Sequence, residues 1–361
     1  MRILGVETSC DETAAAVVID GRRVESNVIW SQIALHRAHG GVVPELAARG
    51  HITAIIPVVE TALAEANVSK GDLDAVAVTA GPGLAGSLLV GVNVAKAFAF
   101  ALGLPLIPVN HLDGHIYANW LGPAGAEPSE PEFPVLCLLV SGGHTELILM
   151  KSHEERVHLG STLDDAAGEA FDKGARTLGL GYPGGPAIQE TALTGDASRF
   201  DLPRAWLGGT DDFSFSGLKT ALLRSVEPYR TEAPASVKVV GSPFVEHVAP
   251  VYAPGAPIAD LAAAYQEAIV EVLAVKAVHA ARAHGAKTLA LAGGVAASKA
   301  LRARIVAEIA AQNVDLGFRV PAFEFCTDNA AMIAGAAFHR PGRTGEAIWE
   351  IDVHPRLPLF A

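Results

Sequence analysis

The segment Arg2-Ile-Leu-Gly-Val-Glu-Thr-Ser9 has the pattern of a strand, and it runs into the polar turn Ser9-Cys-Asp-Glu-Thr13 and a second strand at 14–20. The same order returns later. The apolar run Pro134-Val-Leu-Cys-Leu-Leu-Val140 is followed by the turn Ser141-Gly-Gly-His-Thr145 and by a strand at 146–150. Between and after these two copies, strands end in glycine turns and lead into helices, as in α/β folds. The sequence therefore predicts an α/β chain with a repeated strand–turn–strand unit.

Hydrophobic periodicity and helix start and stop residues predict the remaining elements. We expect strands at 24–30, 73–79, 288–292 and 318–325, and helices at 44–67, from 84 onward, 164–180, 186–193, 217–226, 258–284 and 298–312. Asp328 is placed to cap a further helix. Residues 227–257 hold six prolines and no clear period, which indicates an insertion or a flexible loop.

Composition limits the class of protein. The chain has 361 residues, enough for two domains, and its share of hydrophobic residues, 50%, is that of a globular protein. A net charge of −12 makes it a poor nucleic-acid binder by itself, so an RNA substrate would need a local basic face or a basic partner. Cys10, Cys137 and Cys326 are few and far apart, which fits reduced thiols and excludes a cysteine-based zinc motif.

The apolar segments give no membrane signal. The longest apolar run, at 84–104, is interrupted by three polar or charged residues, so we expect a buried helix that does not span a membrane. Met1 and Arg2 lead directly into a strand, without the pattern of a signal peptide. We expect a cytoplasmic protein without membrane contact.

Two histidines four residues apart stand in the motif Asn110-His111-Leu112-Asp-Gly-His115. In a helix this spacing puts both imidazoles on one face, close enough to share a metal ion. Two histidines at this spacing, with no other ligand, more often lie on the surface or in the core, and a metal site needs a further ligand. Leu112 stands where a zinc peptidase helix carries its general-base Glu, which argues against hydrolysis by that route.

Three glycine turns follow apolar strands: Gly81-Pro82-Gly83, Ser141-Gly142-Gly143 and Gly293-Gly294. Backbone N–H groups in such turns can hold phosphate oxygens, although none of the three matches a nucleotide fingerprint. Most glycines after strands only make the turn. A nucleotide site and plain turns therefore both stay open at this point.

Acidic residues gather in two places. Asp11 and Glu12 lie in the first polar turn, and Asp164, Asp165, Glu169 and Asp172 lie at and after the start of the helix predicted at 164–180. Paired carboxylates can position a metal or take a proton, but acids at helix starts are ordinarily caps. Asp172 beside Lys173 could instead hold ribose hydroxyls, because a carboxylate accepts hydrogen bonds from them.

Eight motifs in order resemble the TsaD/Gcp/Kae-type tRNA threonylcarbamoyladenosine synthase family, formerly described as glycoprotein endopeptidases. They cover nearly the whole chain except the insertion, and they are Gly5-Val-Glu-Thr-Ser-Cys-Asp-Glu-Thr13, Asn110-His-Leu-Asp-Gly-His115, Leu139-Val-Ser-Gly-Gly-His-Thr145, Asp165-Ala-Ala-Gly-Glu-Ala-Phe-Asp-Lys173, Tyr182-Pro-Gly-Gly-Pro186, Phe213-Ser-Phe-Ser-Gly-Leu-Lys219, Ala292-Gly-Gly-Val295 and Cys326-Thr-Asp-Asn-Ala-Ala-Met332.

The resemblance implies a fold and a reaction. The fold is the two-lobed actin/hexokinase/Hsp70-like (ASKHA) α/β fold with duplicated ribonuclease-H-like domains, which we place at 1–125 and 126–361 with the Pro-rich insertion at about 227–257. The reaction is transfer of threonylcarbamoyl from threonylcarbamoyl-AMP to N6 of adenosine 37 in tRNAs that read ANN codons (t6A formation). The implied partners are tRNA, ATP or the adenylate, a TsaB-type paralogue and a TsaE-type ATPase.

Site residues carry over by motif. The resemblance implies that His111, His115 and Asp328 bind one divalent metal ion, usually Fe2+, with Zn2+ possible, and that Asp328 would join the two lobes. The implied substrate contacts are Leu139, Val140, Ser141, Gly142, Gly143, Asp172, Gly185 and, where the family commonly has Asn, Ser298. Gln189 replaces a common Asp. A catalytic role of Glu12 toward the adenine amine is our hypothesis.

Two alternatives remain beside the transferase. One is a metal-dependent glycoprotein endopeptidase, against which Leu112 argues. The other is a non-catalytic ATP-binding scaffold on the same fold, which would not need the three metal ligands.

Overall fold

The computed structural model describes residues 1–361 except 38, 40, 124–127, 129, 232–248 and 361. The chain forms two compact units. Unit 1 comprises Met1–Ala34, Val42–Pro131 and Val320–Ala361, and unit 2 comprises Leu35–Gly41 and Glu132–Arg319. The predicted division near 125 lies close to the crossing from Pro131 to Glu132. The last segment differs, because Val320–Ala361 belongs to unit 1 and not to the second lobe.

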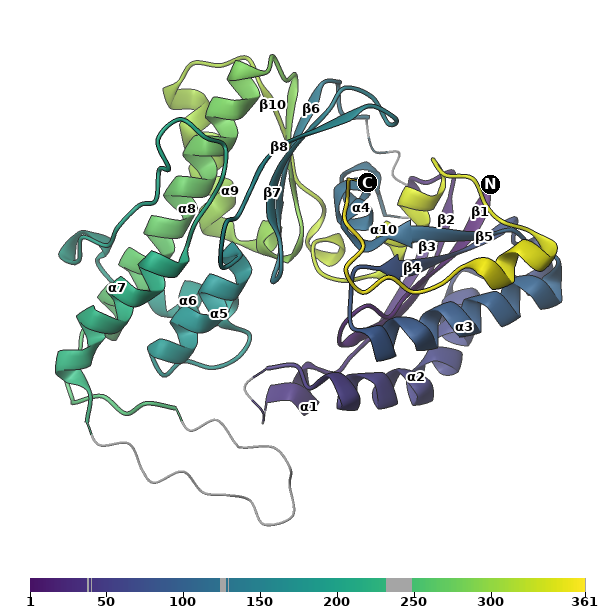
Figure 1. Ribbon diagram of the computed structural model, residues 1–361, viewed down its shortest axis with the longest axis horizontal. Coiled ribbons are helices and arrows are strands. Elements are labelled where there is room, and N and C mark those ends of the chain that lie inside the picture. Colours follow the sequence, from purple (N-terminus) through teal and green to yellow (C-terminus); the bar gives the residue numbers. More distant parts are fainter. Residues whose placement is uncertain (38, 40, 124–127, 129, 232–248, 361) are drawn as a thin grey trace, which may run out of the picture. The chain divides into compact units, whose positions relative to one another are not determined.

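Unit 1 is built on a five-stranded sheet in the order β3-β2-β1-β4-β5 (Figure 1). Its strands are β1 (Arg2–Glu7), β2 (Glu12–Ile19), β3 (Arg23–Ser31), β4 (Ala75–Gly81) and β5 (Leu106–Asn110). The first three form an antiparallel meander, with Val6 opposite Ala15, and β4 and β5 add on as parallel strands. Parallel strands need crossover connections, which the helices supply.

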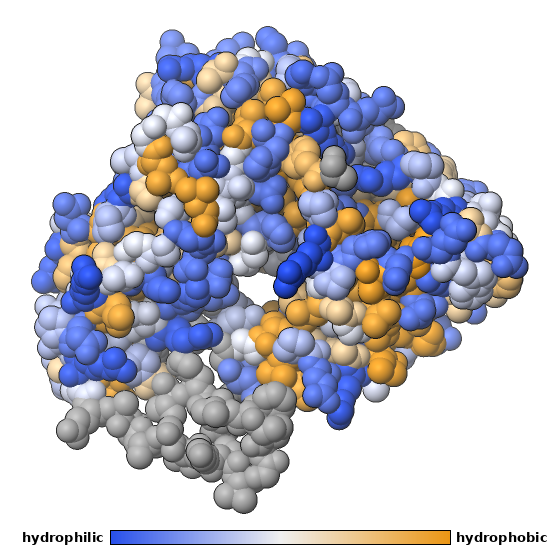
Figure 2. Space-filling view, viewed as in Figure 1, coloured by the Kyte–Doolittle hydropathy of each residue, from blue (hydrophilic) through white to orange (hydrophobic). Residues whose placement is uncertain are grey.

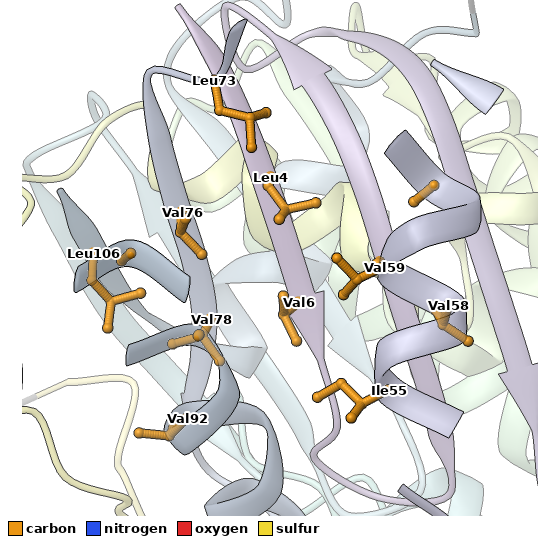
Figure 3. Packing of buried hydrophobic residues seen from close by; sticks show 14 of the residues in the cluster. Leu4, Val6, Ile55, Val58, Val59, Leu73, Val76, Val78, Val92 and Leu106 are labelled. Carbon is orange, nitrogen blue, oxygen red and sulfur yellow. The ribbon is translucent and has the colours of Figure 1, made fainter. Parts of the chain in front are cut away.

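Helices α2 (Pro44–Glu65) and α3 (Ala85–Leu102) cover one face of this sheet. Figure 3 shows Ile55, Val58 and Val92 of these helices packed against apolar side chains of β1 and β4. Both helices are long and apolar enough to cross a membrane by length and composition, as core helices often are. The helix expected at 84–104 is confirmed, but only one of its faces is buried.

The outer faces of α2 and α3 expose apolar side chains. Figure 2 shows apolar residues at the surface over these two helices. The large ones are Ile52, Ile56, Leu89, Phe100 and Leu102.

Helices α4 (His111–Tyr117) and α10 (Ala330–Ala337) pack on each other, and α10 also packs on β1. Gly5 permits that contact, because a Cβ there would lie 2.3 Å from the carbonyl oxygen of Ala330. This packing explains why the C-terminal segment belongs to unit 1. The short α1 (Ile33–Arg37) spans the point where the chain first leaves unit 1.

Unit 2 repeats the topology, with strand order β10-β9-β6-β7-β8. Its strands are β6 (Val135–Val140), β7 (Thr145–Met150), β8 (Arg156–Ser161), β9 (Thr288–Ala292) and β10 (Gly317–Arg319). Its helices are α5 (Ala167–Thr177), α6 (Gly184–Ala192), α7 (Ser216–Val226), α8 (Ile258–Ala283) and α9 (Lys299–Ala311). Strands β6 to β8 form the meander and β9 and β10 the parallel part, so the predicted duplication is confirmed.

Some expected elements differ. The strand predicted at 318–325 is only β10 followed by a 3-10 turn at Phe323–Phe325, and the helix predicted at 164–180 begins later, at Ala167. Strand β8 was not predicted. Most of the proposed insertion, 232–248, lies outside the described residues, and its first residues form a 3-10 turn at Glu227–Tyr229.

Candidate functional site

The histidine pair lies at the start of α4, directly after β5. Asn110 caps the helix, since its side chain accepts a hydrogen bond from the Leu112 N–H at 2.9 Å. The four-residue spacing brings the rings of His111 and His115 together, with centroids 4.7 Å apart and the planes nearly perpendicular. The predicted common face is thus confirmed.

Asp328 supplies the third donor. Its Oδ1 lies 3.5 Å from Nε2 of His111 and 3.2 Å from Nε2 of His115. One donor atom from each residue can be chosen so that all three lie within 4.8 Å of one another. Ligands at about 2.0–2.2 Å from one ion stand roughly 3–3.5 Å apart. The geometry and the donor set, two imidazoles and a carboxylate, therefore fit a divalent transition metal.

The placement of Asp328 depends on its neighbour. The predicted cap at Asp328 is wrong, because Asn329 caps α10 by accepting from the Met332 N–H at 3.0 Å. The Asp328 carboxylate is thereby left for the histidines. Gly114 contributes by letting α4 approach α10, since a Cβ there would lie 2.8 Å from Cδ1 of Ile333. All three donors belong to unit 1, so the idea that Asp328 joins the two lobes is also wrong.

An outer layer of hydrogen bonds orients His111. Its Nδ1 lies 3.0 Å from Oε2 of Glu7 and 3.1 Å from the hydroxyl of Ser9. Glu7 is fully buried and also accepts hydrogen bonds from the Thr79 hydroxyl, at 2.6 Å, and from the Ser9 N–H. A carboxylate behind a ligating histidine fixes the ring and raises its basicity. Nδ1 of His115 is buried and has no partner among the described residues.

The charges at this centre act on one another. Burial alone would lower the pKa of His111, but the Asp328 and Glu7 carboxylates raise it to about 9. Burial alone would raise the pKa of Asp328, but the two histidines lower it to about 2. A proton on His111 thus places positive charge between the Glu7 and Asp328 carboxylates. A bound metal cation would replace this proton.

Glu12 begins β2 beside this centre. Its carboxylate accepts a hydrogen bond from the Ser31 hydroxyl at 3.0 Å. Burial, followed by repulsion from Asp328 and Asp11, raises the pKa of Glu12 to about 9. Since a cation at Asp328 would reverse the second of these causes, metal binding would favour the ionised carboxylate.

The turn Gly81-Pro82-Gly83 is occupied by the protein itself. The Gly83 N–H donates to the Pro355 carbonyl at 3.2 Å, and the Leu84 N–H donates to the Ser9 carbonyl at 2.7 Å. A Cβ on Gly81 would lie 2.0 Å from the carbonyl oxygen of His354. This turn therefore receives the C-terminal segment, and it does not offer free N–H groups as a phosphate site would.

The other two glycine turns lie side by side in unit 2. They follow β6 and β9, which are parallel neighbours with Leu139 opposite Ala292. Gly293 has φ +86°, and a Cβ there would lie 2.4 Å from the Val140 carbonyl oxygen. Within the described chain, a Cβ on Gly142 or Gly143 would meet no atom within 4 Å. Ligands of open α/β sheets bind at such carboxyl ends of strands.

Asp172, in α5, is fixed by the start of α6. Its Oδ1 accepts a hydrogen bond from the Gly184 N–H at 2.7 Å. Burial raises the pKa of Asp172, and that hydrogen bond opposes the shift. The residue also lines a cavity of about 180 Å³ within unit 2. At Gly185, next along α6, a Cβ would meet no described atom within 4 Å.

Comparison with known proteins decides the family. The family model described as TsaD, tRNA N6-adenosine threonylcarbamoyltransferase, matches residues 23–335. The chain belongs to this family. A family member from Thermomicrobium roseum is 62% identical over 99% of this chain and 97% of its own length. One from Symbiobacterium thermophilum is 52% identical over 99% of this chain and 95% of its own. Both carry the name tRNA N6-adenosine threonylcarbamoyltransferase.

A solved structure supports the fold. HypF from T. kodakarensis superposes with a TM-score of 0.56 at 16% identity, over 93% of this chain and 47% of that one. The predicted actin/hexokinase/Hsp70-like α/β fold is confirmed.

The predicted site residues fall into two groups. The predicted metal ligands and Glu12 lie in unit 1, while the predicted substrate contacts, from Leu139 to Gly143 with Asp172, Gly185 and Ser298, lie in unit 2. Ser298 and Gln189, the two positions that depart from the family pattern, both bond to the start of α9. The Ser298 side chain accepts from the Leu301 N–H at 3.3 Å, and that of Gln189 accepts from the Lys299 N–H at 2.9 Å. Both cap α9, and their contact with substrate stays a prediction.

Sequence reasoning missed Glu7 and Ser9 as partners of His111. The sequence did contain a signal for Glu7. This carboxylate ends an apolar strand, β1, and the strand that follows, β2, is apolar as well, so Glu7 could be expected to be buried. A buried carboxylate in such a place needs a partner.

Proposed function

We propose that this chain forms t6A by transferring threonylcarbamoyl from threonylcarbamoyl-AMP to N6 of adenosine 37 in tRNAs that read ANN codons. Membership in the family supports the reaction. The observation that carries the proposal in this chain is the convergence of His111, His115 and Asp328.

The metal assignment is part of the proposal. His111, His115 and Asp328 would hold one divalent ion, Fe2+ in the first place and Zn2+ as the second candidate, because imidazole suits both. Such an ion would supply Lewis acidity toward an oxygen of the adenylate. Glu7 and Ser9 keep Nε2 of His111 directed toward Asp328 by holding Nδ1.

The unit 2 turns are proposed to bind the adenylate. The open positions of Gly142, Gly143 and Gly185 leave room for close approach to the backbone, where N–H groups can donate to phosphate or carbamoyl oxygens. Asp172 has one carboxylate oxygen engaged by Gly184, and the other would accept from ribose hydroxyls.

Asp172→Asn is expected to raise the KM for the adenylate about tenfold, because hydrogen bonds to a charged acceptor contribute about 1.5–3 kcal/mol. Metal content and kcat should stay within about twofold. Steady-state kinetics at varied adenylate and fixed tRNA would measure this. An unchanged KM would remove Asp172 from the substrate site.

Glu12→Gln is expected to lower kcat about 10²-fold without changing the adenylate KM, the usual scale of general acid–base catalysis. The amide preserves the contact with Ser31 but cannot take a proton from the adenine amine. Single-turnover transfer by protein of normal metal content measures the step. Full-rate transfer by folded Glu12→Ala protein would end the catalytic assignment.

Partners and location remain proposals as well. Since the chain is acidic, we propose that tRNA capture is shared with a TsaB-type paralogue and a TsaE-type ATPase in the cytoplasm.

The deciding experiment is a transfer assay with threonylcarbamoyl-AMP and unmodified tRNA, with and without these partners. A tRNA with guanosine at position 37 is the matched control, and nucleoside mass spectrometry detects the product. We expect t6A only in the tRNA with adenosine at position 37. No product with partners present, from protein that still binds ATP, would favour the scaffold alternative.

A further inference from the structure

A buried histidine of α2 holds the polar loop between β1 and β2. His51 has no exposed surface. Its Nε2 lies 2.9 Å from the carbonyl oxygen of Cys10, and its Nδ1 lies 2.7 Å from the Thr13 hydroxyl. A carbonyl only accepts, so Nε2 donates to Cys10. Both ring nitrogens are therefore used on residues that flank Glu12.

Helix α3 holds the same peptide. The Ser87 hydroxyl donates to the Cys10 carbonyl at 3.3 Å, and the Thr8 hydroxyl donates to the Ser87 carbonyl at 2.8 Å. The Cys10 carbonyl thus has donors from two helices. A loop fixed in this way can present its side chains in one arrangement.

The side chains of this loop meet the metal centre. The Ser9 hydroxyl contacts Nδ1 of His111, and the Glu12 carboxyl lies close enough to Asp328 for the two charges to repel each other. A buried histidine with satisfied nitrogens is usually only structural. Here its partners are the backbone of Cys10 and the side chain of Thr13, so losing the ring would free the segment that carries Glu12.

We infer that His51 is a positioning residue, which holds the Cys10 peptide and the Thr13 hydroxyl and thereby sets where Glu12 stands beside Asp328. The catalytic consequence rests on the proposed function. The effect on the loop does not.

The test compares His51→Leu with His51→Gln. Leucine fills the space but offers no hydrogen bond, whereas the glutamine amide can donate to Cys10 and accept from Thr13. Ser26→Ala is the control, because Ser26 is buried in the same unit and accepts from the Val17 N–H at 3.2 Å, within the β2–β3 pair. Urea unfolding of each variant measures its loss of stability.

We expect His51→Leu to lower kcat about tenfold or more, the scale of one or two lost hydrogen bonds, with the adenylate KM within about twofold. His51→Gln should recover most of the rate, and Ser26→Ala should leave it unchanged. Equal rate losses in all three variants, in proportion to lost stability, would overturn the inference.

Thiol labelling gives a readout independent of catalysis. Cys10 is partly exposed, whereas Cys137 and Cys326 are buried, so alkylation of the folded protein reports on the loop. His51→Leu should label Cys10 several-fold faster than wild type, and His51→Gln should not. If wild type forms no t6A, the proposed function fails while this result still decides the role of His51. An unchanged labelling rate in His51→Leu would contradict it.

Discussion

Asp328→Asn is expected to lower metal affinity by more than about 100-fold, because changes in the outer layer of a metal site already cost about 10–100-fold. The carboxamide is neutral, so it attracts a cation less than the carboxylate does. Its N–H group can also donate to the histidine nitrogens that would otherwise bind the metal. Transfer should fall about 10²–10³-fold, as expected for several kcal/mol of lost charge stabilisation. Metal analysis of the purified variant and single-turnover transfer measure the two effects.

Asp164→Asn is the matched control for this change. Asp164 is an equally engaged carboxylate, which accepts from the Ser214 and Ser216 hydroxyls at 2.6 Å, but it lies in unit 2. Its replacement should reduce stability by about 1 kcal/mol, because the hydrogen bonds from the two hydroxyls lose their charged acceptor, and should leave metal content unchanged. Full metal content and full activity of Asp328→Asn would refute the assigned donor set.

Gly5→Ala is expected to destabilise unit 1 by about 1–3 kcal/mol, the usual cost of overpacking. The added methyl would lie 2.3 Å from the Ala330 carbonyl oxygen and 3.1 Å from Cβ of Ala334. Backbone cannot rotate away as a side chain can, so β1 and α10 must separate. Because Asp328 lies two residues before α10, the separation should also reduce metal content. Urea unfolding and metal analysis of the purified variant test both effects.

Gly217→Ala serves as the comparison for Gly5→Ala. Gly217 lies in the first turn of α7, and a Cβ there meets no described atom within 4 Å. The stability of the Gly217→Ala variant should equal or slightly exceed that of wild type, since alanine has a higher helix propensity than glycine. The packing account fails if Gly5→Ala is as stable as this control and binds a full equivalent of metal.

The sequence was sufficient for the duplicated sheet and for the histidine pair, because both depend on local spacing. His111 and His115 share a helix face wherever that helix packs. Asp328 could be assigned only through family resemblance, since no local pattern says which distant acid meets a histidine pair. Its neighbour Asn329 is an equally good cap, and only the packing of α10 on β1 decides which residue caps and which faces the centre.

The turn Gly81-Pro82-Gly83 shows a further limit. Its sequence resembles the two glycine turns of unit 2, yet the Gly83 N–H donates to the Pro355 carbonyl. A contact made by the far end of the chain leaves no signal at the turn itself. The boundary of the lobes failed for the same reason, because the return of Val320–Ala361 to unit 1 depends on tertiary packing.

The most direct test of the account is transfer by metal-depleted protein as Fe2+ or Zn2+ is added back under conditions that keep iron reduced. The account predicts that t6A formation rises from background and reaches a plateau at one metal ion per chain, while Asp328→Asn stays at background over the same range. Full transfer by the metal-free chain would contradict it.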